Sequence, residues 1–242
     1  MILHRIRRKL YKMTHPAVAE VWMLHRVVSH RSEMPRERAL EVTPDWLQQR
    51  IEQHLAQGVH FLSPDELIAT IQAAKQAKNQ KIKHPPYISL TFDEGCRETL
   101  THVVPLFQRL QIPFTLFVTT GLVAGEKPID WYHCQPDMMD WNELIELSRN
   151  PLCTIGAHTI NHPHLCQLNP EAVRQEVGQS RLILEERLRQ PIRYFSYPYG
   201  ERNATVKCQV RQCGYTAAFE AWGGAVRTGA DLFDMPRIPI IQ

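Results

Sequence analysis

Strand-like and helix-like segments alternate along almost the whole chain. Short runs of apolar and β-branched residues are separated by longer segments in which apolar residues recur at helical spacing. The expected strands are residues 20–27, 58–63, 87–92, 114–120, 153–158, 193–198, 216–221 and 237–241. The expected helices are residues 43–57, 64–78, 97–110, 141–149, 170–189 and 204–213. Such repeated βα units predict parallel strands covered by helices, in a doubly wound sheet or a closed barrel.

A dinucleotide-binding sheet has no support, because no GxGxxG run follows an early strand. The chain has 242 residues, which is enough for one well-buried domain, and a single α/β barrel can use all of it. The long irregular stretch at residues 121–139 is the main interruption of the βα pattern.

Composition excludes some classes of protein. The formal net charge of +3 is too small to argue for nucleic-acid binding, and we expect no nucleic-acid partner. No apolar run approaches the roughly 18 to 20 residues needed to span a bilayer. The N-terminus has no continuous apolar stretch and no small-residue cleavage site, and the six cysteines show no CxxC pairs. We therefore expect reduced thiols in a cytoplasmic chain.

Residues 1–20 form a basic extension ahead of the main domain, which we place at residues 21–242. Apolar residues recur at helical spacing in the extension, with five lysines and arginines between them, so a helix is expected. It would either lie on an anionic membrane surface, giving a weakly membrane-peripheral protein, or pack on the domain with its basic face in solvent. The second interpretation is favoured.

Chemically active residue types gather at the ends of the expected strands, where a βα barrel carries its functional residues. They are His25, Asp93 with Glu94, His158 with His162, and residues 197–200. Four strand ends of a barrel meet on one rim, so these side chains are expected to converge.

Two of these groups together favour a metal site. Adjacent carboxylates at Asp93 and Glu94 repel each other, and a divalent cation would offset that repulsion. His158 and His162 could supply two imidazole ligands to the same ion, while one carboxylate ligates and the other acts as a base. An isolated HxxxH is more often a pair of surface or capping histidines. The acid pair at another strand end lowers the weight of that alternative.

Three motifs, LTFDEG, GAHTINHPHL and YFSYPYG, occur here in an order and spacing that resemble the polysaccharide deacetylase family, also called the NodB-homology or carbohydrate esterase 4 family. The segments MLHRV and MPRIPI further resemble the subgroup of poly-N-acetylglucosamine deacetylases. The resemblance runs from about residue 21 to residue 241. It implies a distorted (β/α) barrel, usually of seven strands, that hydrolyses an acetyl group on a sugar.

The resemblance also implies roles for individual residues. Asp93 matches the catalytic base, and the backbone N–H of Tyr199 matches the oxyanion donor. Tyr197 and Pro198 would form the wall of the acetyl pocket. The metal ligands would be Glu94, His158 and His162, holding one divalent ion, with zinc expected first and cobalt, nickel or manganese as alternatives.

The chain departs from the family pattern at three places. Glu94 stands where the family usually has aspartate, which puts metal affinity in doubt. The family's third motif often carries an arginine just before Pro-Tyr, and this arginine orients the catalytic base. The arginine is missing here. Arg237 could supply the guanidinium from the last strand, or it could form a surface salt bridge. The family usually takes its general acid from a histidine near the C-terminus, but no histidine follows His164 in this chain. The first and last strands of a barrel are neighbours, so His25 could be the general acid instead of merely capping its strand.

We therefore expect a metal-dependent hydrolase that removes acetyl groups from N-acetylated sugars. Its partner would be an N-acetylated oligosaccharide, polysaccharide or lipid-linked glycan precursor. Trp131, in the long loop, could stack on a sugar ring, although packing under the loop is nearly as well supported. Two alternatives stay open: a metal-independent amidohydrolase acting on small amides, and a catalytically impaired glycan-binding barrel, for which Glu94 is the main support.

Overall fold

The computed structural model describes residues 14–76, 86–125, 127–129 and 131–242. The helix expected in residues 1–20 lies mostly outside this part of the chain and stays a prediction. The first strand, β1 (Ala17–Leu24), begins inside the expected extension, four residues before the expected start of the barrel domain.

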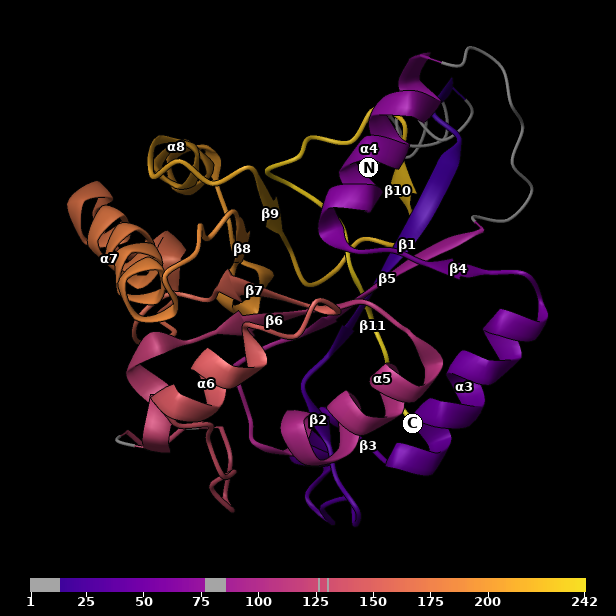
Figure 1. The fold of residues 1–242 in the computed structure, drawn as a ribbon. Helices are drawn as coiled ribbons and strands as arrows, with labels where there is room; N and C mark the ends of the chain where they lie inside the picture. The colour runs from indigo at the N-terminus through magenta and orange to yellow at the C-terminus, as the bar shows by residue number, and fades with distance from the viewer. Residues whose placement is uncertain (1–13, 77–85, 126, 130) are drawn as a thin grey trace.

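One curved sheet forms the centre of the molecule, and the helices surround it (Figure 1). Its parallel strands follow the order β1, β5, β6, β7, β8, β9. Beyond β1 the bounds of the strands are β5 Tyr87–Phe92, β6 Phe114–Val118, β7 Cys153–Ala157, β8 Tyr194–Ser196 and β9 Ala217–Phe219. β6 is buried at every position, as expected of parallel strands covered on both faces.

Short, irregular pairings complete the sheet into a distorted barrel. β11 (Ile238–Pro239) pairs in parallel with β1, and Met235 bridges to Phe219 of β9. Residues 235–239 therefore span the gap between the last and first long strands. Prolines at 236 and 239 lack the N–H that a longer ladder would need, which explains why β11 has two residues instead of the five expected at 237–241. The expected α/β barrel of the NodB-homology type is confirmed.

Helices cover the outside of the sheet (Figure 1). The longer ones among the described residues are α3 Pro44–Ala56, α4 Pro64–Gln76, α5 Val104–Leu110, α6 Trp141–Leu147, α7 Pro170–Leu188 and α8 Ala204–Gln212. The helix expected at residues 97–110 is divided, because a π-helical segment, η1 (Thr99–Val103), precedes α5 and Pro105 lies at the start of α5. Within the described residues, none of the helices has the length and apolar character that crossing a membrane requires.

Shorter elements complete the fold. β2 (Arg26–Val27) pairs with β3 (Glu41–Val42), and α2 (Pro35–Arg38) lies between them. β4 (His60–Phe61) pairs in parallel with the first two residues of β5, and β10 (Val226–Arg227) pairs antiparallel with β1. β10 was not expected from the sequence, since two residues give no periodicity signal.

Candidate active site

The carboxyl ends of the strands surround a cavity of about 540 Å³. Of the ten residues that the sequence analysis named, nine line it: His25, Asp93, Glu94, Trp131, His158, His162, Tyr197, Tyr199 and Arg237. Pro198 is buried beside the cavity and is not among its lining residues. The expectation that four strand ends converge on one rim therefore agrees with the geometry.

Asp93 is buried against the guanidinium of Arg237. Arg237 Nη1 donates to Asp93 Oδ1 and Nη2 donates to Oδ2, both at 2.7 Å, so the pair is bidentate. Arg237 comes from the closing segment next to β11, and its side chain is 1% exposed, which excludes a surface salt bridge. Burial alone would raise the pKa of Asp93, but the charge and hydrogen bonds of Arg237 outweigh it and hold that pKa well below its usual range.

Glu94, His158 and His162 form a buried cluster whose ligand atoms all lie within 4.8 Å of one another. His158 Nδ1 lies 2.8 Å from the carbonyl oxygen of Ser196, which can only accept, so Nδ1 carries the proton and the lone pair is on Nε2. His158 Nε2 and His162 Nε2 are 3.1 Å apart. Glu94 Oε2 is buried and has no hydrogen-bond partner among the described residues.

This donor set fits a divalent cation of the zinc type. Two imidazole nitrogens and one carboxylate are a common three-ligand arrangement in hydrolytic zinc sites. Burial and the neighbouring Asp93 both raise the pKa of Glu94 well above its usual value. A cation near the carboxylate would offset both effects and would give the orphaned Oε2 a partner.

His25 follows β1. This strand lies next to β5 on one side, whereas β7, which leads to His158, lies beyond β6 on the other side. Its Nε2 is 3.9 Å from Glu94 Oε1. Burial lowers the pKa of His25 to about 4, and the charge of Asp93 only partly counteracts this. The ring is therefore neutral at pH 7, whereas a general acid must carry a proton when it acts.

Aromatic rings form one wall of the cavity. Trp131 lies 4.4 Å from the His162 ring and 5.9 Å from the Tyr199 ring, between centroids. Tyr199 also stacks on His164 at 4.1 Å, so both aromatic rings pack around the histidine cluster. Tyr197 is fully buried and donates its hydroxyl to the carbonyl oxygen of Phe233.

Several of these residues have strained backbones. Six described non-glycine residues have positive φ, and four of them lie at or beside the site: Glu94, Thr159, His162 and Tyr199, with φ between 56° and 72°. This left-handed region costs a non-glycine residue about 1–3 kcal/mol, and such strain concentrates at functional sites.

Sequence reasoning did not assign a role to three residues of the site. Ser196 accepts a hydrogen bond from Arg237 Nη2 at 2.8 Å and orients His158 through its carbonyl. The backbone carbonyl oxygen of Glu220 accepts a hydrogen bond from Arg237 Nε at 2.5 Å. Trp222 lines the cavity. A polar residue inside the buried strand YFS was the available signal for Ser196, whereas nothing in the sequence marked Glu220 or Trp222.

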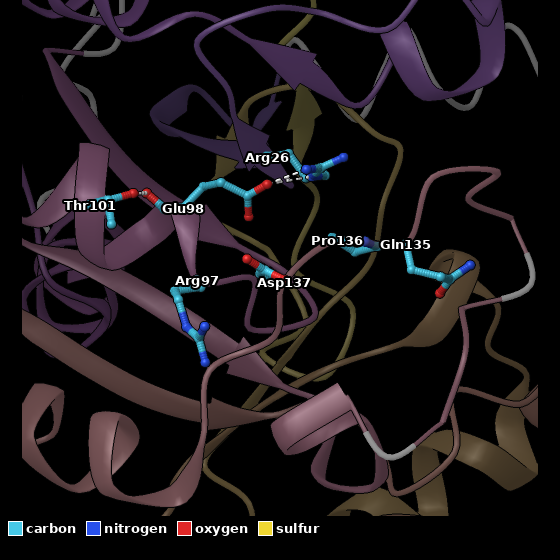
Figure 2. A pocket seen from close by; sticks show the side chains of 7 residues that line it. All are labelled: Arg26, Arg97, Glu98, Thr101, Gln135, Pro136 and Asp137. Atoms are coloured by element: carbon cyan, nitrogen blue, oxygen red, sulfur yellow. Dashed lines mark hydrogen bonds and ion pairs between the residues drawn. The ribbon is translucent and has the colours of Figure 1, made fainter.

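A second, polar cavity of about 330 Å³ lies beside β2 and η1 (Figure 2). Arg26 pairs there with Glu98, and its guanidinium also contacts Glu41 at 3.0 Å. No histidine lines this cavity, and Arg97, which does line it, pairs with Glu143 outside it. It therefore lacks the donor set that distinguishes the cavity at the strand ends.

Comparison with known proteins identifies the family. The family model for polysaccharide deacetylases matches residues 80–218, more than half of the chain. The chain therefore belongs to the polysaccharide deacetylase family, as the motifs predicted, and so to the hydrolases that act on carbon–nitrogen bonds other than peptide bonds.

Individual relatives are distant. YxkH of Bacillus subtilis (strain 168), whose name places it with the polysaccharide deacetylases, is 21% identical over 229 residues, covering 95% of this chain and 74% of that protein. A poly-β-1,6-N-acetyl-D-glucosamine N-deacetylase of Staphylococcus aureus (strain MSSA476) is 23% identical over 62% of this chain. The chain spans 53% of the length of that enzyme.

Solved structures share the fold. The chain resembles IcaB from Ammonifex degensii with a TM-score of 0.75 and 23% identity, over 93% of this chain and 92% of that one. It resembles the deacetylase PplD of Streptococcus pyogenes, solved in complex with acetate, with a TM-score of 0.73 and 24% identity over 93% of each chain. At this level of identity the likeness concerns the fold alone.

Proposed function

We propose that this protein is a metal-dependent deacetylase that hydrolyses the N-acetyl group of a hexosamine in a glycan or glycan precursor. One observation carries the proposal: a buried carboxylate–arginine pair and a buried Glu–His–His cluster line the same cavity in a chain of the polysaccharide deacetylase family. The names of the relatives support an N-acetylated sugar polymer as the substrate class.

In this proposal Glu94, His158 and His162 hold one divalent ion, most simply zinc. When bound, the ion would supply Lewis-acid polarisation of the acetyl carbonyl and would make water more acidic. The acidification matters because Arg237 makes Asp93 a weak base in its resting state. Arg237 in return fixes both carboxylate oxygens, so that Asp93 meets the water in one orientation.

The remaining roles fall to residues around the cavity. Asp93 accepts the proton of the attacking water, and the backbone N–H of Tyr199 donates to the oxygen on which negative charge develops. Tyr197 borders the acetyl pocket and Trp131 supports His162 and contacts the sugar. Asp93 then releases this proton, and His25, neutral in the resting site, takes it up and donates it to the leaving amine.

Acetate release tests the proposal directly. The protein should be stripped of metal with a chelator, reconstituted with zinc, cobalt, nickel or manganese, and incubated with β-1,6- and β-1,4-linked N-acetylglucosamine oligomers. We expect release of one acetate per exposed amine, abolished by the chelator and restored by metal. Release that survives complete removal of metal would instead support a metal-independent amidohydrolase, and metal binding without release would support a glycan-binding barrel.

The histidine cluster gives an independent check. His158→Ala should lose stoichiometric metal while its circular dichroism spectrum stays that of the parent protein. His164→Ala is the matched control, because His164 lies close by and stacks on Tyr199 without belonging to the Glu–His–His cluster. Full metal occupancy in His158→Ala would remove the assignment.

A further inference from the structure

The chain between the two histidines of the Glu–His–His cluster folds back on itself without regular secondary structure. His158 follows β7 and His162 comes four positions later, yet their Nε2 atoms lie only 3.1 Å apart. Thr159 and His162 have φ angles of 68° and 56°, so the backbone is left-handed at both ends of this turn. Such a turn keeps its shape only where the surrounding groups hold it.

The carbonyl groups of the turn are held by the segment after β6. The N–H of Thr120 donates to the carbonyl oxygen of Thr159 at 3.1 Å, and the N–H of Gly121 donates to that of Ile160 at 2.8 Å. Thr159 Oγ1 also accepts the backbone N–H of His162 at 2.9 Å. These bonds leave two N–H groups in the middle of the turn to be satisfied by another part of the fold.

One carboxylate on α7 satisfies both of them. Glu176 Oε2 accepts the N–H of Ile160 at 3.0 Å and the N–H of Asn161 at 2.9 Å. Glu176 Oε1 accepts the side-chain amide of Asn161 at 2.6 Å. Hydrogen bonds to an ionised group are stronger than those between neutral groups. The turn is therefore held firmly by a long helix whose own residues do not line the cavity.

The two histidines depend on this turn to different degrees. The N–H of His158 donates to the carbonyl oxygen of Val118 at 2.9 Å, and its Nδ1 donates to that of Ser196. In contrast, His162 Nδ1 is buried and has no hydrogen-bond partner among the described residues. The position of the His162 ring is therefore set by the turn and by packing against Trp131.

Resting on the metal site proposed above, we propose that Glu176 is a positioning residue, which holds the turn of residues 159–161 so that His162 faces the ion beside His158. Groups that orient a metal ligand without touching the ion are typically worth about 10- to 100-fold in metal affinity. Because His158 is held independently, removal of Glu176 should act on the metal through His162 alone.

Zinc affinity, measured by competition with a chelating dye, tests the role of Glu176. We expect Glu176→Ala to weaken zinc binding by about 10- to 100-fold. Glu176→Gln should recover part of the loss, because its amide oxygen can still accept the two backbone N–H groups. The absorption spectrum of the cobalt-loaded protein should also change in Glu176→Ala, since the His162 ligand is displaced. Circular dichroism checks that each variant is folded.

Glu185→Ala is the matched control on the same helix. The Glu185 carboxylate also accepts a backbone N–H, that of Ile192 at 3.0 Å, but the segment it holds carries no residue of the Glu–His–His cluster. Zinc affinity and the cobalt spectrum should be unchanged by this substitution. An equal loss in Glu185→Ala and Glu176→Ala would show that α7 only supports the fold.

A double-mutant cycle separates positioning of His162 from a general loosening of the site. In the His162→Ala protein, zinc binding should be weak and Glu176→Ala should weaken it little further, because the ligand that Glu176 positions is absent. Additive losses in this cycle would overturn the inference.

Amide hydrogen exchange of the metal-free protein tests the hold on the turn without any ion. Exchange at Ile160 and Asn161 should be faster in Glu176→Ala than in the parent protein, because both N–H groups lose their acceptor. Unchanged exchange, or zinc affinity unchanged by Glu176→Ala, would also overturn the inference. A parent protein that shows all the expected zinc losses but releases no acetate would overturn the proposed reaction and leave the role of Glu176 intact.

Discussion

Asp93 and Glu94 are adjacent in the sequence, yet their side chains lie in opposite electrostatic environments. Arg237 holds the pKa of Asp93 well below its usual range, although burial opposes this, whereas burial and the charge of Asp93 raise the pKa of Glu94. Two carboxylates whose pKa values are driven apart commonly serve different chemical roles. At this site the ionised Asp93 suits a proton acceptor. Glu94, whose Oε2 has no hydrogen-bond partner among the described residues, suits a metal ligand.

Substitution of the two acids should separate these roles. Asp93→Asn should keep stoichiometric metal and lose at least about 100-fold in turnover, because the base is lost and the ligand set is intact. Glu94→Gln should weaken metal binding first. Metal content by mass spectrometry and acetate release measured on the same samples check this. Loss of metal in Asp93→Asn with full metal in Glu94→Gln would reverse the assignment.

Glu94→Asp tests the departure from the family pattern. The aspartate is one methylene shorter, and the backbone at this position has φ 72°, a conformation that aspartate adopts more readily than glutamate. If the site is built around the longer side chain, metal affinity should fall, and competition with a fluorescent chelator would measure it. Tighter metal binding and higher turnover would show that Glu94 is only a tolerated replacement.

His25→Ala tests proton donation to the leaving group. We expect a loss of about 10²- to 10⁴-fold in turnover of the N-acetyl substrate, with metal content unchanged. An activated acetyl ester needs little protonation of its leaving group, so its hydrolysis should fall much less. Equal losses on amide and ester would exclude His25 as the general acid.

At the scale of elements, the turn at Pro198–Gly200 depends on glycine. Gly200 has φ +68°, and a Cβ there would meet Ala221 at 2.6 Å. Gly125 has nearly the same φ, +69°, but among the described residues no atom lies within 4 Å of such a Cβ. Gly125→Ala should therefore cost only the backbone strain, about 1–2 kcal/mol. Gly200→Ala should cost about 1–3 kcal/mol more through overpacking.

Urea unfolding of the two variants measures the difference. Gly200→Ala should also reduce turnover, because Tyr199 and Ala221 must move, whereas Gly125→Ala should not. Equal destabilisation by the two substitutions would show that the contact with Ala221 relaxes without cost.

Long periodic elements were predictable from the sequence, and short ones were not. The helix expected at residues 170–189 matches α7 to within a residue, because nineteen residues carry a clear apolar face and Asn169 caps its start. β10 and β11 have two residues each and are defined by what they pair with, so a local pattern cannot predict them. The π-helix η1 is also a tertiary feature, since the sequence of 97–110 is compatible with an ordinary helix.

For the whole molecule, the sequence motifs predicted which side chains meet, but not how they are held. The positions of Glu94, His158 and His162 followed from strand ends and from the family resemblance. The positive φ angles at Glu94 and Tyr199 could not be predicted, because they arise from the surrounding packing. The roles of Glu220 and Trp222 were missed for the same reason, since both depend on how the segment after β9 meets the closing segment.

Closure of the barrel should contribute measurably to stability through Arg237. This side chain joins the closing segment to Asp93 after β5 and to Glu220 after β9. Arg237→Met leaves Asp93 buried without its partner, so in the presence of a chelator we expect a loss of about 3–5 kcal/mol in the free energy of unfolding. The double variant with Asp93→Asn should lose less than the sum of the two single losses, because neither charge is then left alone.

The pH dependence of unfolding provides the second readout of the same pair. The pKa of Asp93 is lower in the folded protein than in the unfolded chain, where it is about 3.9. Its ionised form therefore stabilises the fold above about pH 4, and this contribution is lost as the pH falls below that value. Urea unfolding of the metal-free protein between pH 3 and pH 7 should show a steeper loss of stability below about pH 4 for the parent than for Asp93→Asn. Identical pH profiles, together with additive single losses, would show that the bidentate contact between Asp93 and Arg237 does not hold the barrel closed.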